Sequence, residues 1–281
     1  MLPSIKDNGI LRDYQIELKQ EVFSAWAAGA VDVCAVSPTG SGKTKTSASI
    51  VKEFTSEGQP VVISAHRQEL VAQLSCAMAA EGVYHNLIAS RSTVNLVSNL
   101  QVSKFGRSYY HPDAPSAVSS VDTIIRRDLG SYCDEVALYM TDECHHQAGA
   151  AKGGPNKWLK ARHMFPNALG LGVTATPDRA DGQGLGRHAD GCFDVLVEGP
   201  TMRELIRRGY LTDYRIFCPP SDMDLSTVSV SAGGDYSRDG LKLASRKSSI
   251  VGDVVKEYLK IAAGKRGITF AVSVEDAEDI A

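Results

Sequence analysis

The chain has 281 residues, of which 43% are apolar, so it can bury a sizeable core in one or two domains. Its 30 basic and 33 acidic residues give a net charge of −3, which excludes a histone-like polycation but leaves room for a local basic groove. No apolar run approaches the roughly 20 residues of a membrane span, and residues 1–15 lack the basic flank and apolar stretch of a signal peptide.

Apolar runs alternate with helical patterns along most of the chain. Apolar residues recur at helical spacing over 44–54 and over 70–78, which predicts two helices. The apolar runs themselves predict six strands, at 31–37, 60–65, 94–98, 114–121, 136–142 and 168–175. Strands that are apolar nearly throughout, separated by helices, predict a mostly parallel sheet covered on both faces, an α/β three-layer sandwich. Ligands of such sheets bind beyond the carboxyl ends of the strands.

The strand pattern ends near residue 219, so residues 1–219 are predicted to form the first domain. A stretch rich in serine and glycine follows, and residues 220–246 are interpreted as a polar linker or mobile loop. An amphipathic helix over 251–262, a strand over 267–273 and the start of another helix come next. Because about sixty residues are too few for a second α/β domain, we expect the chain to stop inside one, which residues 247–281 begin.

Six cysteines are scattered through the chain without a C-x-x-C pair. This pattern is typical of reduced thiols in a cytosolic protein and argues against a zinc site. They are Cys34, Cys76, Cys133, Cys144, Cys192 and Cys218.

The stretch "SPTGSGKT" (37–44) stands between a predicted strand and a predicted helix. Gly40 and Gly42 let backbone N–H groups converge on one point, and the helix that follows adds its positive amino-terminal dipole. Lys43 can then reach the β- and γ-phosphates of a nucleotide, while the Thr44 hydroxyl can ligate Mg²⁺. The alternative is an ordinary turn with an incidental lysine, and Ser37 stands where the common P-loop pattern has glycine.

The stretch "YMTDECHH" (139–146) places two carboxylates at the end of an apolar strand. Burying such a pair is costly unless a metal or a cation compensates. Asp142 can hold Mg²⁺, and Glu143 can orient or deprotonate an attacking water. The alternative is a solvated acidic turn. His145 and His146 are not expected to bind a metal together, because neighbouring side chains on such a turn face different ways.

The third stretch is "GLGVTATP" (170–177), in which Thr174 and Thr176 follow a strand that ends before Pro177. Their hydroxyls could hydrogen-bond to the acidic site and sense a γ-phosphate, although any exit from a strand could look the same.

The order "SPTGSGKT", "SAHRQEL", "TDECHH" and "GVTATP" resembles the first RecA-like lobe of superfamily 2 helicases and translocases, over roughly residues 10–219. The similarity is greatest to the DExH subgroup of phage helicases and restriction-type translocases, which tolerates serine at position 37. It implies an ATP- and Mg²⁺-dependent nucleic-acid motor, DNA more than RNA, in a bacterial or phage-infected host cytoplasm. It also implies a RecA-like P-loop fold followed by an incomplete second RecA-like lobe, since "GKRGITFAVSVEDAE" is similar to that lobe's first strand and helix.

The resemblance carries family roles onto matching positions. It implies that the catalytic residues are Lys43, Asp142, Glu143 and His145. In "LRDYQ", Gln15 and Arg12 would contact the adenine, although Asp13 stands where many members have proline. The nucleotide-binding residues would be Arg12, Gln15, Thr39, Gly40, Ser41, Gly42, Lys43, Thr44, Thr174 and Thr176, with Thr44 and Asp142 on the metal. "AHRQEL" and "SSVDTIIRR" would supply the nucleic-acid contacts Arg67, Gln68, Thr123, Arg126 and Arg127.

Three functions stay open at this point. A complete motor needs a second lobe in cis, whose arginines would accelerate hydrolysis by about 10³–10⁵, so this chain by itself is expected to hydrolyse ATP slowly and to unwind nothing. A non-catalytic interaction module for nucleic acid or protein is the main alternative. A P-loop kinase is weaker, because no arginine-rich lid segment is found in the predicted lobe.

Overall fold

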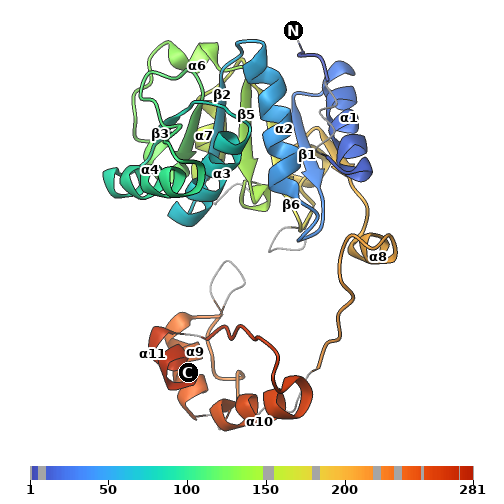
Figure 1. Cartoon of the computed structure of the whole chain (residues 1–281), viewed down its shortest axis with the longest axis vertical. Coiled ribbons are helices and arrows are strands. Elements are labelled where there is room, and N and C mark those ends of the chain that lie inside the picture. Colours follow the sequence, from blue (N-terminus) through green and yellow to red (C-terminus); the bar gives the residue numbers. More distant parts are fainter. Residues whose placement is uncertain are drawn as a thin grey trace. The chain divides into compact units, whose positions relative to one another are not determined.

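A computed structural model describes residues 2–5, 11–147, 155–178, 184–217, 223–230, 236–247, 250–271 and 273–280. The chain divides into two compact units, Met1–Thr212 and Asp213–Ala281 (Figure 1). The first unit therefore ends before the predicted boundary at residue 219.

The first unit is built on one parallel sheet of seven strands in the order β3-β4-β2-β5-β6-β1-β7. The strands are β1 (Asp32–Val36), β2 (Val61–Ala65), β3 (Asn86–Ile88), β4 (Ala117–Ser120), β5 (Leu138–Asp142), β6 (Leu169–Thr174) and β7 (Val195–Glu198). The helices are α1 (Asp13–Ala27), α2 (Lys43–Ser56), α3 (Gln68–Ala80), α4 (Arg91–Phe105), α5 (Val121–Ile124), α6 (Tyr132–Glu135), α7 (Lys157–His163) and α8 (Met202–Arg207). This is the predicted α/β sandwich with a RecA-like parallel sheet.

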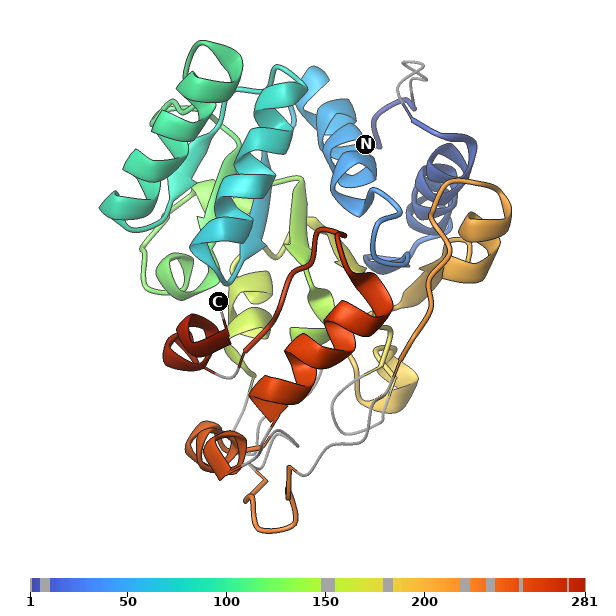
Figure 2. The same ribbon diagram turned by 60° about the horizontal axis from the view of Figure 1, so that its bottom comes forward.

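Side chains alternate between the two faces of the sheet along each strand, so a separate core lies on each face. On β1, Val33 and Ala35 face a large core formed with α1 to α4, whereas Cys34 belongs to a smaller cluster on the other face. Helices α2, α3 and α4 lie side by side over the first face (Figure 2). On the second face Tyr139 packs with Trp158 and Phe165 beneath α7. Burial on both faces is why the strands are apolar nearly throughout.

Five of the six strands predicted in this unit are confirmed, and the one at 94–98 is wrong. Residues 94–98 lie inside helix α4, whose amino terminus Ser90 caps by accepting a hydrogen bond from Thr93 N at 3.2 Å. Val94 and Val97 face the large core at helical spacing. The strands β3 and β7 are short and were not predicted, because runs of three and four residues carry little periodicity.

The second unit contains helices α9 (Arg238–Lys247), α10 (Ile250–Ala262) and α11 (Val274–Ile280). Helix α10 matches the predicted amphipathic helix and α11 the predicted final one. Helix α9 occupies part of the predicted linker 220–246, and residues 267–271 of the predicted strand are not in a strand. Cys218 lies outside the described residues. Within the part of the chain that is described, no helix has the length and apolar character of a bilayer span.

Two buried ion pairs tie elements of the first unit together, one between two helices and one between a helix and the sheet. Lys19 of α1 bonds Glu53 of α2 at 2.5 Å and Ser49 at 2.9 Å. Arg162 of α7 reaches Asp32 at 2.6 Å, and its other nitrogens donate to the carbonyls of Phe165 and Ala168. Removing one partner of such a pair leaves a buried charge unpaired, which typically lowers the free energy of unfolding by about 3–5 kcal/mol.

His85 joins α3, β3 and α4 in one buried polar network. Its Nδ1 donates to the Val83 carbonyl at 2.9 Å, so its Nε2 accepts from the Ser75 hydroxyl at 2.6 Å. Gln101 of α4 donates to the same hydroxyl at 2.8 Å. Burial lowers the pKa of His85 to about 4, so the folded protein holds this ring neutral.

This buried ring predicts a pH-dependent stability. The unfolded chain protonates His85 near its ordinary pKa of about 6.5, whereas the folded chain resists protonation down to about pH 4. Stability is therefore full above pH 6.5 and falls as the pH drops toward 4. From pH 8 to pH 5 the loss due to His85 is about 2 kcal/mol. Denaturant titrations of wild type and His85→Gln at both pH values measure it; equal pH dependence in the two proteins would contradict it.

Candidate nucleotide-binding site

The strand order brings the three predicted motifs to neighbouring strand ends. Strand β6 lies between β5 and β1, with Val36 paired to Thr174 and Asp142 paired to Val173. Just beyond these pairs, Ser37 N donates to the Thr174 carbonyl at 3.0 Å. The glycine-rich loop, the acidic pair and the threonines therefore meet at one edge of the sheet, as the sequence predicts.

The loop 37–42 is held by groups on α1. Gln15 Nε2 and the Tyr14 hydroxyl both donate to the Ser41 carbonyl at 2.8 Å, and both side chains are buried. Gly42 has φ of +84°, and a Cβ there would lie 2.4 Å from Gln15 Nε2. Gly40 has φ of +83°, and a Cβ there would lie 3.0 Å from the Leu211 side chain. Only glycine fits at position 42 without displacing Gln15, which together with Tyr14 forms a brace on the Ser41 carbonyl.

Ser37 takes part in closing the loop. Its hydroxyl donates to Ser41 Oγ at 2.7 Å, and both residues are almost fully buried. A hydroxyl pair thus fills the space at the position where the common P-loop pattern has glycine. Thr39 stays exposed at the tip.

Lys43 begins α2 and lies near both acids. Partial burial lowers the pKa of its ammonium, and the charges of Glu143 and Asp142 act in the opposite direction. Its hydrogen bond to the Pro38 carbonyl is long, at 3.5 Å, as is the bond from Gln73 Nε2 to the Thr44 hydroxyl. A desolvated, weakly bonded cation beside a loop of N–H groups suits a polyanion.

Glu143 stands in a left-handed conformation, φ 52° and ψ 50°, which is uncommon for a residue with a Cβ. It turns the chain sharply at the end of β5 into a 3-10 turn, Cys144–His146, and its N–H donates to Asp142 Oδ1 at 3.0 Å. Such outliers cost about 1–3 kcal/mol and cluster at functional sites. Burial and the charge of Glu143 raise the pKa of Asp142, with Lys43 and His145 opposing.

Cys144 anchors this turn from below. Its Sγ lies 3.5 Å from Cys34 Sγ in the buried cluster beneath β1, and burial raises the pKa of its thiol. Gly172 of β6 makes room, because a Cβ there would lie 2.7 Å from Cys144 Sγ. The central cysteine of "DECH" is therefore a packing residue with an unreactive thiol.

The threonines contact the acidic turn through His145. Thr174 Oγ1 donates to the Thr176 carbonyl at 3.1 Å, so His145 Nδ1 donates to Thr174 Oγ1, 3.0 Å away. The same nitrogen lies 3.4 Å from Glu143 Oε2 and 3.3 Å from Thr176 Oγ1. Within the 3-10 turn the rings of His145 and His146 have centroids 4.2 Å apart, yet the two side chains contact different groups, His145 the threonines and His146 the Trp158 ring.

The predicted adenine contacts lie beside the loop. Both amide atoms of Gln15 are engaged, since its Oε1 also accepts from Arg12 N at 2.9 Å. The Arg12 guanidinium lies 4.9 Å from the ring centroid of Tyr210, which in turn packs against Tyr14. Tyr210 was missed by sequence reasoning because it is remote in sequence and carries no motif. An exposed arginine over a half-buried tyrosine offers stacking surface for a base.

The predicted nucleic-acid contacts lie at the same end of the sheet, in the segments that follow β2 and β4. Arg67 caps α3 directly after β2, and Gln68 is the first residue of that helix. Thr123 lies in α5, directly after β4, and Arg126 and Arg127 follow that helix. All three arginines are exposed. Since β4 pairs with β2, these groups are brought together, beside the nucleotide motifs rather than among them.

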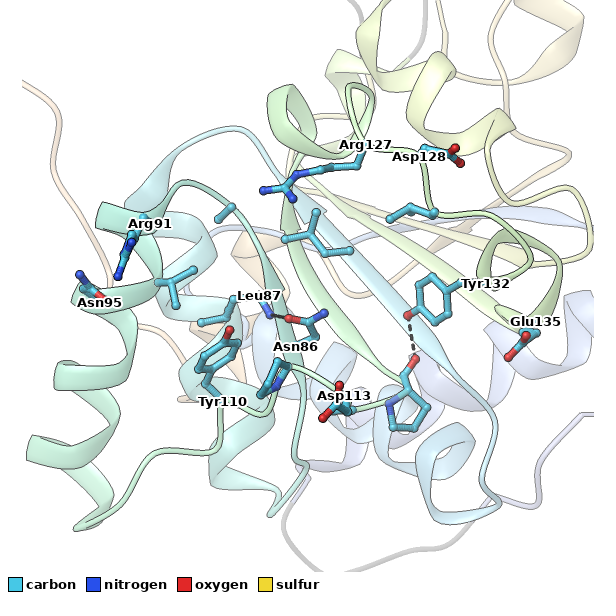
Figure 3. A pocket seen from close by; sticks show the side chains of 17 residues that line it. Asn86, Leu87, Arg91, Asn95, Tyr110, Asp113, Arg127, Asp128, Tyr132 and Glu135 are labelled. Atoms are coloured by element: carbon cyan, nitrogen blue, oxygen red, sulfur yellow. Dashed lines mark hydrogen bonds between the residues drawn. The ribbon is translucent and has the colours of Figure 1, made fainter.

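Arg127 also lines a cavity of about 960 Å³ at the β3 edge of the sheet. Arg91 and Asn95 of α4 lie on one side of it, and Tyr132 and Glu135 of α6 on the other (Figure 3). The Tyr132 hydroxyl closes the base of the cavity by donating to the Pro115 carbonyl at 2.7 Å. No residue of the glycine-rich loop or the acidic turn lines it, so it is separate from the nucleotide site.

Comparisons with known proteins agree with this arrangement. The family model described as "Type III restriction enzyme, res subunit" (ResIII) matches residues 8–179. A 51.5 kDa protein of a Lactococcus phage is 31% identical over 245 residues, covering 87% of this chain and 45% of that protein. The putative ATP-dependent helicase IRC3 of Saccharomyces cerevisiae is 23% identical over 257 residues, covering 89% of this chain and 35% of that protein.

Among solved structures, the DUF1998 helicase MrfA superposes with a TM-score of 0.54 at 16% identity, covering 96% of this chain and 37% of that one. This likeness shows the fold. The ResIII match covers more than half of the chain, so the chain belongs to that family. The chain spans less than half the length of the curated relatives it matches.

Gly42 allows a matched test of the loop. Gly42→Ala should weaken the binding of a fluorescent ATP analogue at least tenfold, because the new Cβ displaces Gln15 from the Ser41 carbonyl. Gly58→Ala is the control: its φ is +74° but nothing lies within 4 Å of the added Cβ, so it carries the backbone strain alone. Equal affinities in the two variants would show that the brace does not shape the site.

Proposed function

We propose that this member of the ResIII family is the ATP-binding part of an ATP-dependent nucleic-acid helicase or translocase. The observation that carries the proposal is the meeting of Lys43, Asp142 and Glu143 at the ends of β1 and β5, separated only by β6. A second lobe supplied in cis belongs to the proposal as well, and turnover by this chain alone is expected to be slow. DNA is the proposed partner because the family is described by a restriction enzyme.

Different residues of the site would bind the phosphates, the base and the metal ion. The N–H groups of Thr39, Gly40 and Gly42 and the Lys43 ammonium would hold the β- and γ-phosphates, and Arg12 with Tyr210 would flank the base. Thr44 and Asp142 would hold Mg²⁺ through their oxygen atoms. The metal would neutralise charge on the phosphates during transfer.

Glu143 is proposed as the general base. Its left-handed backbone lies at the end of β5, and His145 Nδ1 is 3.4 Å from one of its carboxylate oxygens. Thr174 and Thr176 hold His145, so a change at the end of β6 would reach Glu143 through a single ring. The proton of the attacking water would pass to the Glu143 carboxylate.

Two substitutions separate binding from turnover. Lys43→Ala should remove detectable binding of an ATP analogue, because the ammonium that faces both acids is lost. Glu143→Gln should keep the affinity within about threefold and lower hydrolysis at least a hundredfold, since the amide cannot take a proton. Isothermal titration measures the affinity, and phosphate release measures the rate of hydrolysis. Unchanged affinity in Lys43→Ala would refute the site, and binding without turnover in the wild type, with or without nucleic acid, would favour the interaction module.

The arginines after α5 allow a test of the nucleic-acid surface. Replacing Arg126 and Arg127 by alanine should weaken binding of single- and double-stranded DNA of any sequence. Each lost phosphate contact should reduce the slope of log affinity against log salt by about 0.7–0.9. Arg107→Ala is the control, because this exposed arginine follows the carboxyl end of α4 and stacks on Tyr109. An unchanged slope in the double variant would remove these residues from the proposed surface.

A further inference from the structure

A cluster of three rings connects the acidic turn to both proposed nucleic-acid segments. His146, the last residue of the 3-10 turn, stacks on Trp158 of α7 with centroids 5.8 Å apart and planes at 12°. His66, which follows β2 and precedes Arg67, meets both rings edge-on, 5.2 Å from His146 and 5.7 Å from Trp158. These separations are those of favourable aromatic pairs.

Polar contacts extend the three-ring cluster in two directions. Asn156, which caps α7, donates to the carbonyls of His146 and Gln147 at 3.2 and 3.3 Å, so the turn is clamped to the start of that helix. Lys157 then donates to both carboxylate oxygens of Asp122 in α5, at 2.9 and 3.0 Å. Arg126 and Arg127 follow α5 directly.

Two further features set the three-ring cluster apart from ordinary packing. His66 Nδ1 is buried and has no hydrogen-bond partner among the described residues, although buried ring nitrogens are normally bonded. Partial burial, helped by His145, lowers the pKa of His146 to about 4, so its ring is neutral near pH 7 and stacks as an uncharged aromatic. A ring that stacks without strong bonds can shift with the elements around it.

We propose that the three-ring cluster couples the nucleic-acid surface to the nucleotide site, with His146 as a positioning residue. Displacement of Arg67 or of α5 by a bound strand would move His66 or α7, and the stacked His146 would pass that movement to His145 and Glu143. The inference rests on the proposed function, because it assumes that both sites are occupied by those ligands.

Coupling of this kind appears in binding equilibria, where it is reciprocal and commonly amounts to 5–150-fold. The affinity of the chain for a non-hydrolysable ATP analogue with Mg²⁺ is measured with and without a saturating single-stranded oligonucleotide. We expect a ratio of at least about fivefold in the wild type. His146→Ala should bring the ratio below twofold, while each ligand alone binds as before. His146→Phe keeps a ring on Trp158 and should restore most of the ratio.

Lys157→Gln and His163→Ala complete the test. Lys157→Gln cuts the link to α5 at an exposed ion pair, leaves the link through His66, and should lower the ratio below that of the wild type with little effect on folding. His163→Ala removes an exposed histidine from the same helix and should keep the wild-type ratio. If His146→Ala fails to fold, the affinity ratio measured for Lys157→Gln decides whether the coupling exists.

The outcomes are distinct. A wild type that binds both ligands independently overturns the coupling and leaves the proposed function standing, and so does a His146→Ala protein that keeps the full ratio. A wild type that binds neither the analogue nor the oligonucleotide refutes the proposed function and the coupling with it.

Discussion

The site depends on one constraint, the insertion of β6 between β5 and β1. With β6 in the middle, the Ser37 N–H and the Thr174 carbonyl bond directly, and Asp142 is paired one residue earlier on the other side. The lysine that follows β1 and the acids that follow β5 are therefore separated by one intervening strand. The hydrogen-bonded register of the sheet sets this geometry, so it does not depend on the conformation of a loop.

The sheet alone does not hold the loop open. Its backbone passes through two left-handed glycines, and the Ser41 carbonyl is bonded by Gln15 and Tyr14 from α1. Helix α1 is in turn fixed to α2 by the buried Lys19–Glu53 pair. The loop is therefore fixed from both flanking helices before any ligand arrives, and this preorganisation reduces the entropy lost on binding. The shape of this eight-residue segment therefore depends on residues far from it in sequence.

Much of this could be predicted from the sequence, and the limits have physical reasons. The central strands are long and apolar on both faces, so their pattern is plain, and three motifs at their ends identify the site. The edge strand β3 has only three residues, and α4 shows a five-residue apolar pattern that suits a strand as well as a helix. Tyr210, Trp158 and the roles of Ser37 and Cys144 depend on tertiary contacts between distant segments, which local periodicity does not record.

The second histidine of "DECHH" shows how one short turn can serve two partners. His145 points to Thr174 and Glu143, on the nucleotide side, whereas His146 points to Trp158 and His66, toward the segments after β2 and β4. A 3-10 turn permits this, because consecutive side chains diverge by about a third of a turn while their rings still touch. The tight left-handed bend at Glu143 is thus what allows one five-residue segment to contact both sites.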